Sequence, residues 1–146
     1  KIDVPLIIAG NKPSQELKEA VSDNPNIEIR TNLNTQEIHQ LIKDAQVNVL
    51  PTFQATGIKL KLLAALYMGR HCLVNSFMVE NTGLEPLCRV EDTDKRFIQA
   101  VQSLFAEEFS ISSRKKREVI LNQRFCNTVN AKKLHSLIFD SEILRK

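Results

Sequence analysis

A glycine and two lysines at the start of an apolar helical pattern are the residues of this chain best suited to chemistry. Gly57 precedes Lys59 and Lys61, and the apolar pattern over 58–67 is typical of a buried helix. The amides of a first helical turn and the positive end of the helix dipole favour an anion, and a glycine lets a ligand approach the backbone closely. We therefore expect a phosphate-bearing ligand at the amides that follow the glycine. These amides belong to Ile58, Lys59 and Leu60.

The two lysines cannot both face one ligand atom, because helix positions two residues apart point about 200° away from each other. We expect Lys61 to fold back toward the phosphate, and Lys59 to reach it from the loop side or to stay in water. The alternative is that both lysines extend from a buried helix into solvent, with their stems on apolar surface. Both interpretations stay open at the level of the sequence.

Short apolar runs of strand type alternate with helical patterns along the chain, and this alternation positions the glycine and the lysines. The expected strands are 5–10, 26–32, 46–51, 71–76 and 87–92, and the expected helices follow caps at Ser14 and Thr35 and then cover 58–67, 93–105, 113–125 and 129–144. Strands separated by single helices need right-handed crossovers and form a parallel sheet. The pattern predicts an α/β fold, a Rossmann-like doubly wound parallel sheet with extra helices at the C-terminus, in a single domain over 1–146.

Helical periodicity also predicts which side chains of the helices face the core. Gly69 is expected at the C-prime position that ends the helix 58–67. The side chains expected to point inward are Leu17, Ala20 and Val21, then Ile38, Leu41, Ile42 and Ala45, and finally Phe97, Ile98, Val101 and Phe105.

Composition indicates an ordinary globular chain of 146 residues, with 42% apolar residues, 25% charged residues and a net charge of +3. The basic residues are scattered among acids, so a nucleic-acid partner is not expected. The densest basic run, Arg114 to Arg117, is interpreted as a solvated helix face. No apolar run reaches the roughly 20 residues of a membrane span, and we expect a cytoplasmic protein. The first residue is not methionine and a strand follows within a few residues, so we expect a fragment of a longer chain.

Cysteines and histidines do not predict a metal centre. The cysteines lack close spacing and are interpreted as free thiols in a reducing compartment, and the histidines have no partner spacing for a metal or a triad. No metal and no cofactor are therefore expected. The residues concerned are Cys72, Cys88, Cys126, His39, His71 and His135.

Loops that follow the strands are the expected ligand-binding positions, because ligands of open parallel sheets bind at the carboxyl ends of the strands. These loops are 10–14, 31–34, 51–57 and 76–86. Gly10 is followed by Asn11 and Lys12 and does not begin the GxGxxG pattern, and the P-loop pattern is absent. Dinucleotide binding in the usual mode is not expected. The end of the first strand also lacks the acids of a phospho-acceptor domain.

The order of these motifs resembles the C-terminal half of a GT-B glycosyltransferase, of the retaining group 1 or family 4 type. The similarity is carried by PLIIAG, NIEIRTNLNTQEIHQLIKDAQVNVLP, TGIKLKLLAALYMGRHCLVNS and NTGLE. Many members of that family have a glycine, a base, a lysine and a closing glycine in the order found here. The matching residues are Gly57, Lys59, Lys61, Ala65 and Gly69.

The resemblance implies a domain that binds a nucleotide-diphosphate sugar donor, in an enzyme that transfers a hexosyl group to a glycan or lipid-linked acceptor in polysaccharide biosynthesis. Fixed positive groups would stabilise the charge that develops on the departing diphosphate. The implied diphosphate site is Thr56, Gly57, Ile58, Lys59 and Lys61, the implied base loop contains Thr31, Asn32 and Leu33, and Gly83 and Leu84 would line the sugar side. No residue of this chain is assigned as catalytic.

Two departures from the family pattern limit this expectation. Relatives commonly carry glutamates at the positions of Thr56 and Ala64, and the second holds the ribose hydroxyls, which alanine cannot do. Ribose recognition would then use Glu80 or Glu85, or the chain is a divergent member. The resemblance also implies a missing N-terminal acceptor-binding domain, without which this chain would bind weakly and be inactive, and peripheral membrane association of the full-length protein.

Two other classes of function stay open on the sequence. One is a non-catalytic Rossmann-like interaction domain that pairs with another chain, which the residues at Thr56 and Ala64 favour. The other is a domain of a sugar-nucleotide epimerase type, whose acid and base would also lie in a partner half.

Overall fold

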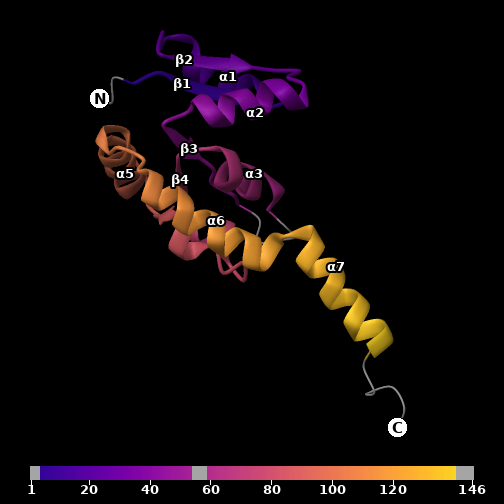
Figure 1. Ribbon diagram of the computed structural model, residues 1–146. Coiled ribbons are helices and arrows are strands. Elements are labelled where there is room, and N and C mark those ends of the chain that lie inside the picture. Colours follow the sequence, from indigo (N-terminus) through magenta and orange to yellow (C-terminus); the bar gives the residue numbers. More distant parts are fainter. Residues whose placement is uncertain (1–3, 54–58, 141–146) are drawn as a thin grey trace. The chain divides into compact units, whose positions relative to one another are not determined.

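The computed structural model describes residues 4–53 and 59–140, and the chain forms two compact units, Lys1–Glu108 and Phe109–Lys146 (Figure 1). In the first unit, strands and helices alternate as the sequence predicts, except that two short helices over 76–79 and 85–87 were not predicted. Its elements are β1 (Leu6–Ala9), α1 (Gln15–Ser22), β2 (Ile27–Arg30), α2 (Thr35–Asp44), β3 (Val47–Val49), α3 (Leu60–Met68), β4 (His71–Val74), α4 (Ser76–Val79), η1 (Glu85–Leu87), β5 (Arg89–Val90) and α5 (Asp94–Ala106). The predicted α/β class is confirmed.

The strands of the first unit pair in parallel, and the described ones form a two-stranded sheet and a three-stranded sheet. The first sheet has the order β1-β2 with Leu6 opposite Ile27. The second has the order β3-β4-β5, with Val47 opposite His71 and Leu73 opposite Arg89. In Figure 1 α1 lies beside the first sheet, and α2 and α3 contact each other. Parallel pairing with a helix after each strand is the expected Rossmann-like arrangement.

The core of the first unit is centred on β4, whose four residues are all buried. Leu73 packs with Ala100 and Leu104 of α5, and Phe97 and Val101 border this cluster. The predicted inward positions of Phe97 and Val101 are therefore confirmed.

Two other predicted core positions of α5 are wrong. Ile98 is 51% exposed and Phe105 is 45% exposed. The buried face takes positions 97, 100, 101 and 104, a run of i, i+3, i+4 and i+7, and each wrong position lies one residue, or about 100°, beyond it. Earlier in the chain Ile38 of α2 is 41% exposed and Ala20 of α1 is exposed, so these predictions are wrong as well. Both of these helices belong to the part of the unit where β1 itself is largely exposed.

Helix caps follow the predicted chemistry with one correction. Ser14 caps α1, since its hydroxyl accepts a hydrogen bond from the Leu17 amide at 3.2 Å. The cap of α2 is Asn34, and Thr35 is the first helical residue. The Asn34 side chain accepts from the Glu37 amide at 3.0 Å, and the Glu37 carboxylate accepts from the Asn34 amide at 2.7 Å. This reciprocal capping box needs a glutamate three residues after the cap, which only the start at Asn34 supplies.

Gly69 ends α3 as its C-cap, and not as the C-prime residue. Its φ of −88° is one that any residue can adopt, so the left-handed conformation is not the reason for a glycine. A Cβ atom at this position would lie 2.5 Å from Nδ2 of Asn48 and 2.8 Å from the carbonyl oxygen of Ala65. Glycine is required here because the end of α3 approaches the buried Asn48 of β3 closely.

The second unit contains the expected additional helices, α6 (Ile111–Phe125) and α7 (Asn127–His135), and a short π-helical segment over Ser136–Asp140. The end of the predicted helix 129–144 lies outside the described residues. Arg117 corrects the interpretation of the basic run as a solvated face, because it is 6% exposed and its guanidinium lies 4.6 Å from the centre of the Phe109 ring. The flat guanidinium stacks on aromatic faces, which allows a charged residue of this run to be buried. Within the described residues, none of the helices has the length and apolar content needed to cross a membrane.

Candidate functional site

Asn75 links the carboxyl ends of β3 and β4 by two hydrogen bonds. The Thr52 amide donates to Oδ1 of Asn75 at 3.0 Å, and Nδ2 of Asn75 donates to the Thr52 carbonyl at 2.6 Å. A primary amide can satisfy a backbone amide and carbonyl at the same time, as a neighbouring strand would. The pair of bonds extends the connection between the two strands past the end of β3 into the loop that precedes α3.

Asp92 links the carboxyl ends of β4 and β5, also by two hydrogen bonds. Asp92 accepts from the Ser76 hydroxyl at 2.6 Å and from the Ser76 amide at 2.8 Å. These two bonds hold the pKa of Asp92 below its ordinary value, and the bond from the hydroxyl has the larger effect. We call these four hydrogen-bonded residues, Thr52, Asn75, Ser76 and Asp92, the carboxyl-end rim.

Lys61 reaches the loop that leads from this rim into α3. Its Nζ donates to the carbonyl oxygen of Pro51 at 3.3 Å, and the side chain is exposed. The side chain therefore folds back from the first turn of α3 toward the end of β3, in the direction that the sequence predicts. That a phosphate meets it there stays a prediction.

The N-terminus of α3 is described from Lys59 onward. Lys59 is its N-cap, and no side chain caps the helix. The Lys59 carbonyl accepts from the amides of Leu62 and Leu63 at 2.9 and 3.1 Å, so intrahelical bonding begins with these amides. Three residues of the expected site, Thr56, Gly57 and Ile58, lie outside the described residues. Ala64, at the position where relatives carry a glutamate, is half-buried in α3.

The loops after β1 and β2 are joined by another side-chain hydrogen bond. The Asn32 amide donates to Oδ1 of Asn11 at 3.0 Å, and Asn32 has a φ of 57°. Asparagine tolerates this left-handed conformation better than most residues. Thr31 is exposed and Leu33 is half-buried. The structure therefore forms the expected base loop as a defined turn, with its contacts to a nucleotide still a prediction.

The two residues expected on the sugar side occupy a turn after α4. Gly83 has a φ of 64°, which a glycine adopts without strain. The Leu84 amide donates to the hydroxyl of Thr82 at 3.1 Å, and its side chain is 1% exposed. The Leu84 side chain belongs to the core, so a ligand could contact this residue only through its backbone. Glu80 and Glu85, the expected alternatives for ribose recognition, are both exposed.

Sequence reasoning named the loops of Thr52 and Ser76 as ligand-binding positions, but it missed Asn75, Asp92 and the bonds of the carboxyl-end rim. Each rim residue is polar and lies one to three residues after the end of a strand, and this position could have identified them. His71, which the sequence interprets as structural, is buried with its Nε2 at 3.1 Å from the carbonyl oxygen of Glu107. In 4–53 and 59–140 no group of three or more His, Cys, Asp or Glu side chains gathers in a way that could hold a metal.

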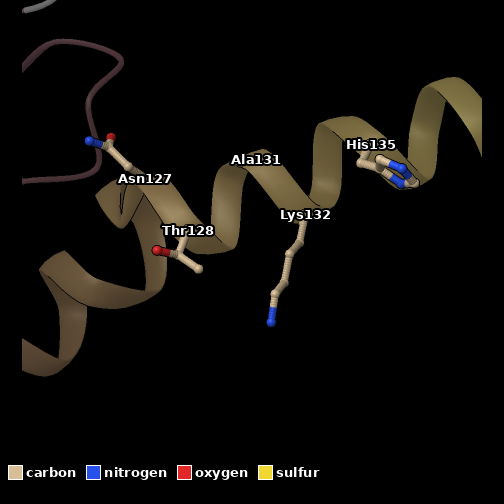
Figure 2. Close-up of a pocket in the computed structure, with 5 residues that line it drawn as sticks. All are labelled: Asn127, Thr128, Ala131, Lys132 and His135. Atoms are coloured by element: carbon tan, nitrogen blue, oxygen red, sulfur yellow. The ribbon is translucent and has the colours of Figure 1, made fainter.

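A surface hollow in the second unit is formed by one face of α7 (Figure 2). Its lining comes from positions i, i+1, i+4, i+5 and i+8 of a single helix. One helix face cannot surround a small molecule, so we do not assign a ligand to this hollow. The lining residues are Asn127, Thr128, Ala131, Lys132 and His135.

Comparison with known proteins gives one match. Residues 1–107 match the family profile described as glycosyl transferases group 1. This match includes all of the described strands and ends one residue before the end of the first unit. No curated protein and no solved structure matches the chain significantly.

Proposed function

Because this chain belongs to the group 1 glycosyltransferases, we propose that it is the domain of such an enzyme that binds a nucleotide-diphosphate sugar. Family membership supports glycosyl transfer as the activity. The proposal adds that residues 1–107 hold the donor and that the acceptor binds to an N-terminal domain outside this chain. We further propose a cytoplasmic enzyme that transfers a hexosyl group to a glycan or lipid-linked acceptor in polysaccharide biosynthesis, at the membrane surface.

The single observation that carries the proposal is the position of Lys61. Its ammonium group lies 3.3 Å from the Pro51 carbonyl, beside the carboxyl-end rim, where parallel α/β sheets bind their ligands. Glycosyl transfer places negative charge on the departing diphosphate, and a fixed cation lowers the energy of that charge. In this proposal Lys61, with Lys59 and the first-turn amides of α3, supplies that positive charge.

The remaining assignments place the other parts of the donor at the loops that follow β2 and β4. Thr31, Asn32 and Leu33 border the nucleotide base, and the Gly83 and Leu84 backbone lines the sugar. Since Ala64 replaces the ribose-binding glutamate of relatives, Glu80 or Glu85 takes the ribose hydroxyls in this proposal. Both carboxylates are exposed and unshielded by the core.

The test is a thermal-shift panel with UDP, GDP and ADP, each with and without a sugar, at millimolar concentration. We expect a shift for one base only. Lys61→Ala should weaken binding by about 1.5–3 kcal/mol, the value of a hydrogen bond to a charged group. Lys43→Ala, an exposed lysine in the last turn of α2, is the matched control and should leave the shift unchanged.

A second candidate function is a non-catalytic interaction domain, which Thr56 and Ala64 favour because they replace the two glutamates of active relatives. The same panel, applied to the complete gene product, separates the two proposals. A flat panel there, together with stable association with another protein, would replace donor binding by this second function.

A further inference from the structure

Asn75 lies where β4 ends and α4 begins, and its side chain continues the pairing of β4 with β3. The Leu50 amide donates to the Leu73 carbonyl at 2.9 Å. In a parallel ladder the next bond of this kind would run from the Thr52 amide to the Asn75 carbonyl, two residues further on each strand. Here the Thr52 amide donates to Oδ1 of Asn75 at 3.0 Å, and Nδ2 of Asn75 donates to the Thr52 carbonyl at 2.6 Å. The side chain thus takes the place of a backbone partner after the end of β3.

The backbone of Asn75 serves α4. Its carbonyl accepts from the Met78 amide at 2.9 Å in the first turn of that helix. Asparagine is among the preferred N-cap residues, and Asn75 occupies the N-cap position of α4, but its side chain does not cap the helix. The side-chain amide is committed to Thr52, so it acts on the loop that follows β3.

One peptide group connects Asn75 with Lys61. The amide of this group belongs to Thr52 and is held by Asn75, and its carbonyl belongs to Pro51 and accepts from Nζ of Lys61 at 3.3 Å. A peptide group is planar, and in a trans group the N–H and the C=O point in opposite directions. A bond that fixes the direction of the amide therefore also fixes the direction of the carbonyl. The proline ring restricts the segment further, because it holds the φ of Pro51 near about −65°.

We propose that Asn75 is a positioning residue for the donor site, which holds the Lys61 ammonium group in place through the Pro51–Thr52 peptide. This inference rests on the proposed function, in which Lys61 meets the diphosphate. An exposed lysine has a flexible stem and loses conformational freedom when it binds a ligand. A side chain that is already held beside the end of β3 loses less, so Asn75 strengthens donor binding without touching the donor.

Gln46 provides a matched control for a merely structural role. Its Nε2 donates to the carbonyl oxygens of Glu107 at 2.7 Å and of Leu104 at 3.4 Å. Like Asn75, it is a half-buried primary amide that makes two bonds to backbone groups. It lies directly before β3, whereas Lys61 contacts the loop after that strand. Gln46→Ala should therefore lower stability and leave Lys61 in place.

The first test observes Lys61 without nucleotide, in the complete gene product. NMR of lysine side chains distinguishes ordered from mobile groups on the picosecond to nanosecond scale, and the Lys61 signal is identified by its absence in Lys61→Arg. We expect Asn75→Ala to shift this signal to the position of an exposed lysine such as Lys43, and Gln46→Ala to leave it unchanged.

A milder variant keeps this test decisive if Asn75→Ala does not fold. Asn75→Gln retains the primary amide but displaces it by one methylene, so it should shift the Lys61 signal in the same direction. An unchanged Lys61 signal in the variants of Asn75, or an equal shift in Gln46→Ala, would overturn the proposal.

The second test measures binding of UDP, GDP and ADP to the same proteins. For the nucleotide that binds, we expect Asn75→Ala to raise the Kd about 2- to 10-fold, as loss of one neutral hydrogen bond does, and Gln46→Ala to leave it unchanged. In a Lys61→Ala background, Asn75→Ala should have no further effect, because the group that Asn75 positions is absent. Additive losses in the double variant would overturn the proposal.

The two tests separate this inference from the proposed function. If none of the three nucleotides binds to the wild-type protein, the proposed function fails, and the role of Asn75 in donor binding fails with it. The ligand-free signal of Lys61 then shows whether Asn75 positions the lysine at all. If a nucleotide binds and the Lys61 signal does not respond to Asn75, the proposed function stands and only the positioning role is refuted.

Discussion

Replacing Gly69 by alanine should destabilise the first unit through one overcrowded contact. The added methyl carbon would lie 2.5 Å from Nδ2 of Asn48, closer than any real contact of that kind. Asn48 is 7% exposed and its Nδ2 donates to the Ile42 carbonyl at 3.2 Å, so the amide cannot move without losing that bond. The carbonyl oxygen of Ala65 would lie 2.8 Å from the methyl carbon. Because this oxygen belongs to the backbone of α3, it can move even less than the Asn48 side chain.

The magnitude follows from three contributions. Overpacking in a tight site costs about 1–3 kcal/mol, and loss of the Asn48 hydrogen bond costs about 1 kcal/mol more. The φ of −88° suits alanine, so the reduced freedom of the unfolded chain returns about 0.4–1 kcal/mol. We expect a net loss of roughly 1–3.5 kcal/mol, or a fall in Tm of about 2–14 °C for a chain of this size.

The assay is urea unfolding followed by circular dichroism, with Gly10→Ala as the matched control. A Cβ at Gly10 meets nothing within 4 Å, so this variant should be neutral or slightly stabilised. The double variant Asn48→Ala/Gly69→Ala removes the crowded amide and should cost less than the sum of the single variants. If Gly69→Ala is as stable as Gly10→Ala, or if the two costs are additive, the steric explanation of this glycine is refuted.

Three further predictions concern single side chains. The pKa of Asp92 is lowered from its ordinary value of 3.8. The carboxylate therefore contributes to stability above that value, and this contribution is lost as the pH falls through the lower pKa of the folded state. The stability difference between wild type and Asp92→Asn should disappear in an acid titration. Asn75→Ala removes both bonds to Thr52 and should cost about 1–3 kcal/mol, with faster exchange of the Thr52 amide than in wild type; unchanged exchange would contradict the role of Asn75. Amides of the next helix lower the pKa of the Cys126 thiol, so iodoacetamide should modify Cys126 before the buried Cys72, and the reverse order would be a failure of this reasoning.

The sequence was sufficient for the fold class because strand and helix periods differ along this chain. Apolar runs such as 6–9 and 71–74 have no helical spacing, so these strands could be predicted. The short helix α4 that follows 71–74 was not predicted, and no side chain caps it. Faces of helices were harder to assign. Ile98 and Phe105 are as apolar as Phe97, and only the neighbouring strand decides which of these side chains it covers. The amphipathic pattern itself leaves an uncertainty of about one residue, or 100°, around the helix.

The candidate site could be predicted by position and not by its bonds. The sequence places Thr52 after the expected strand 46–51 and places Asn75 and Asp92 at the ends of the expected strands 71–76 and 87–92. Which of them meet depends on the order β3-β4-β5, which the order along the chain does not fix. The α2 cap shows the same limit on a local scale. Asn34 and Thr35 are both good caps, and the carboxylate of Glu37 decides between them.

The bond between Lys61 and Pro51 also indicates how a donor could be received. At 3.3 Å this bond to a neutral carbonyl is long, and its energy is modest in an exposed setting. A phosphate oxygen would offer the same ammonium group an acceptor of opposite charge, which makes a stronger bond than a neutral carbonyl does. Because Asn75 holds the adjoining Thr52 by two bonds, the exchange of partner would not require the start of the loop to leave the rim. Lys61 would thus move from carbonyl to phosphate by side-chain rotation alone, and Lys61→Arg should retain donor binding that Lys61→Ala loses.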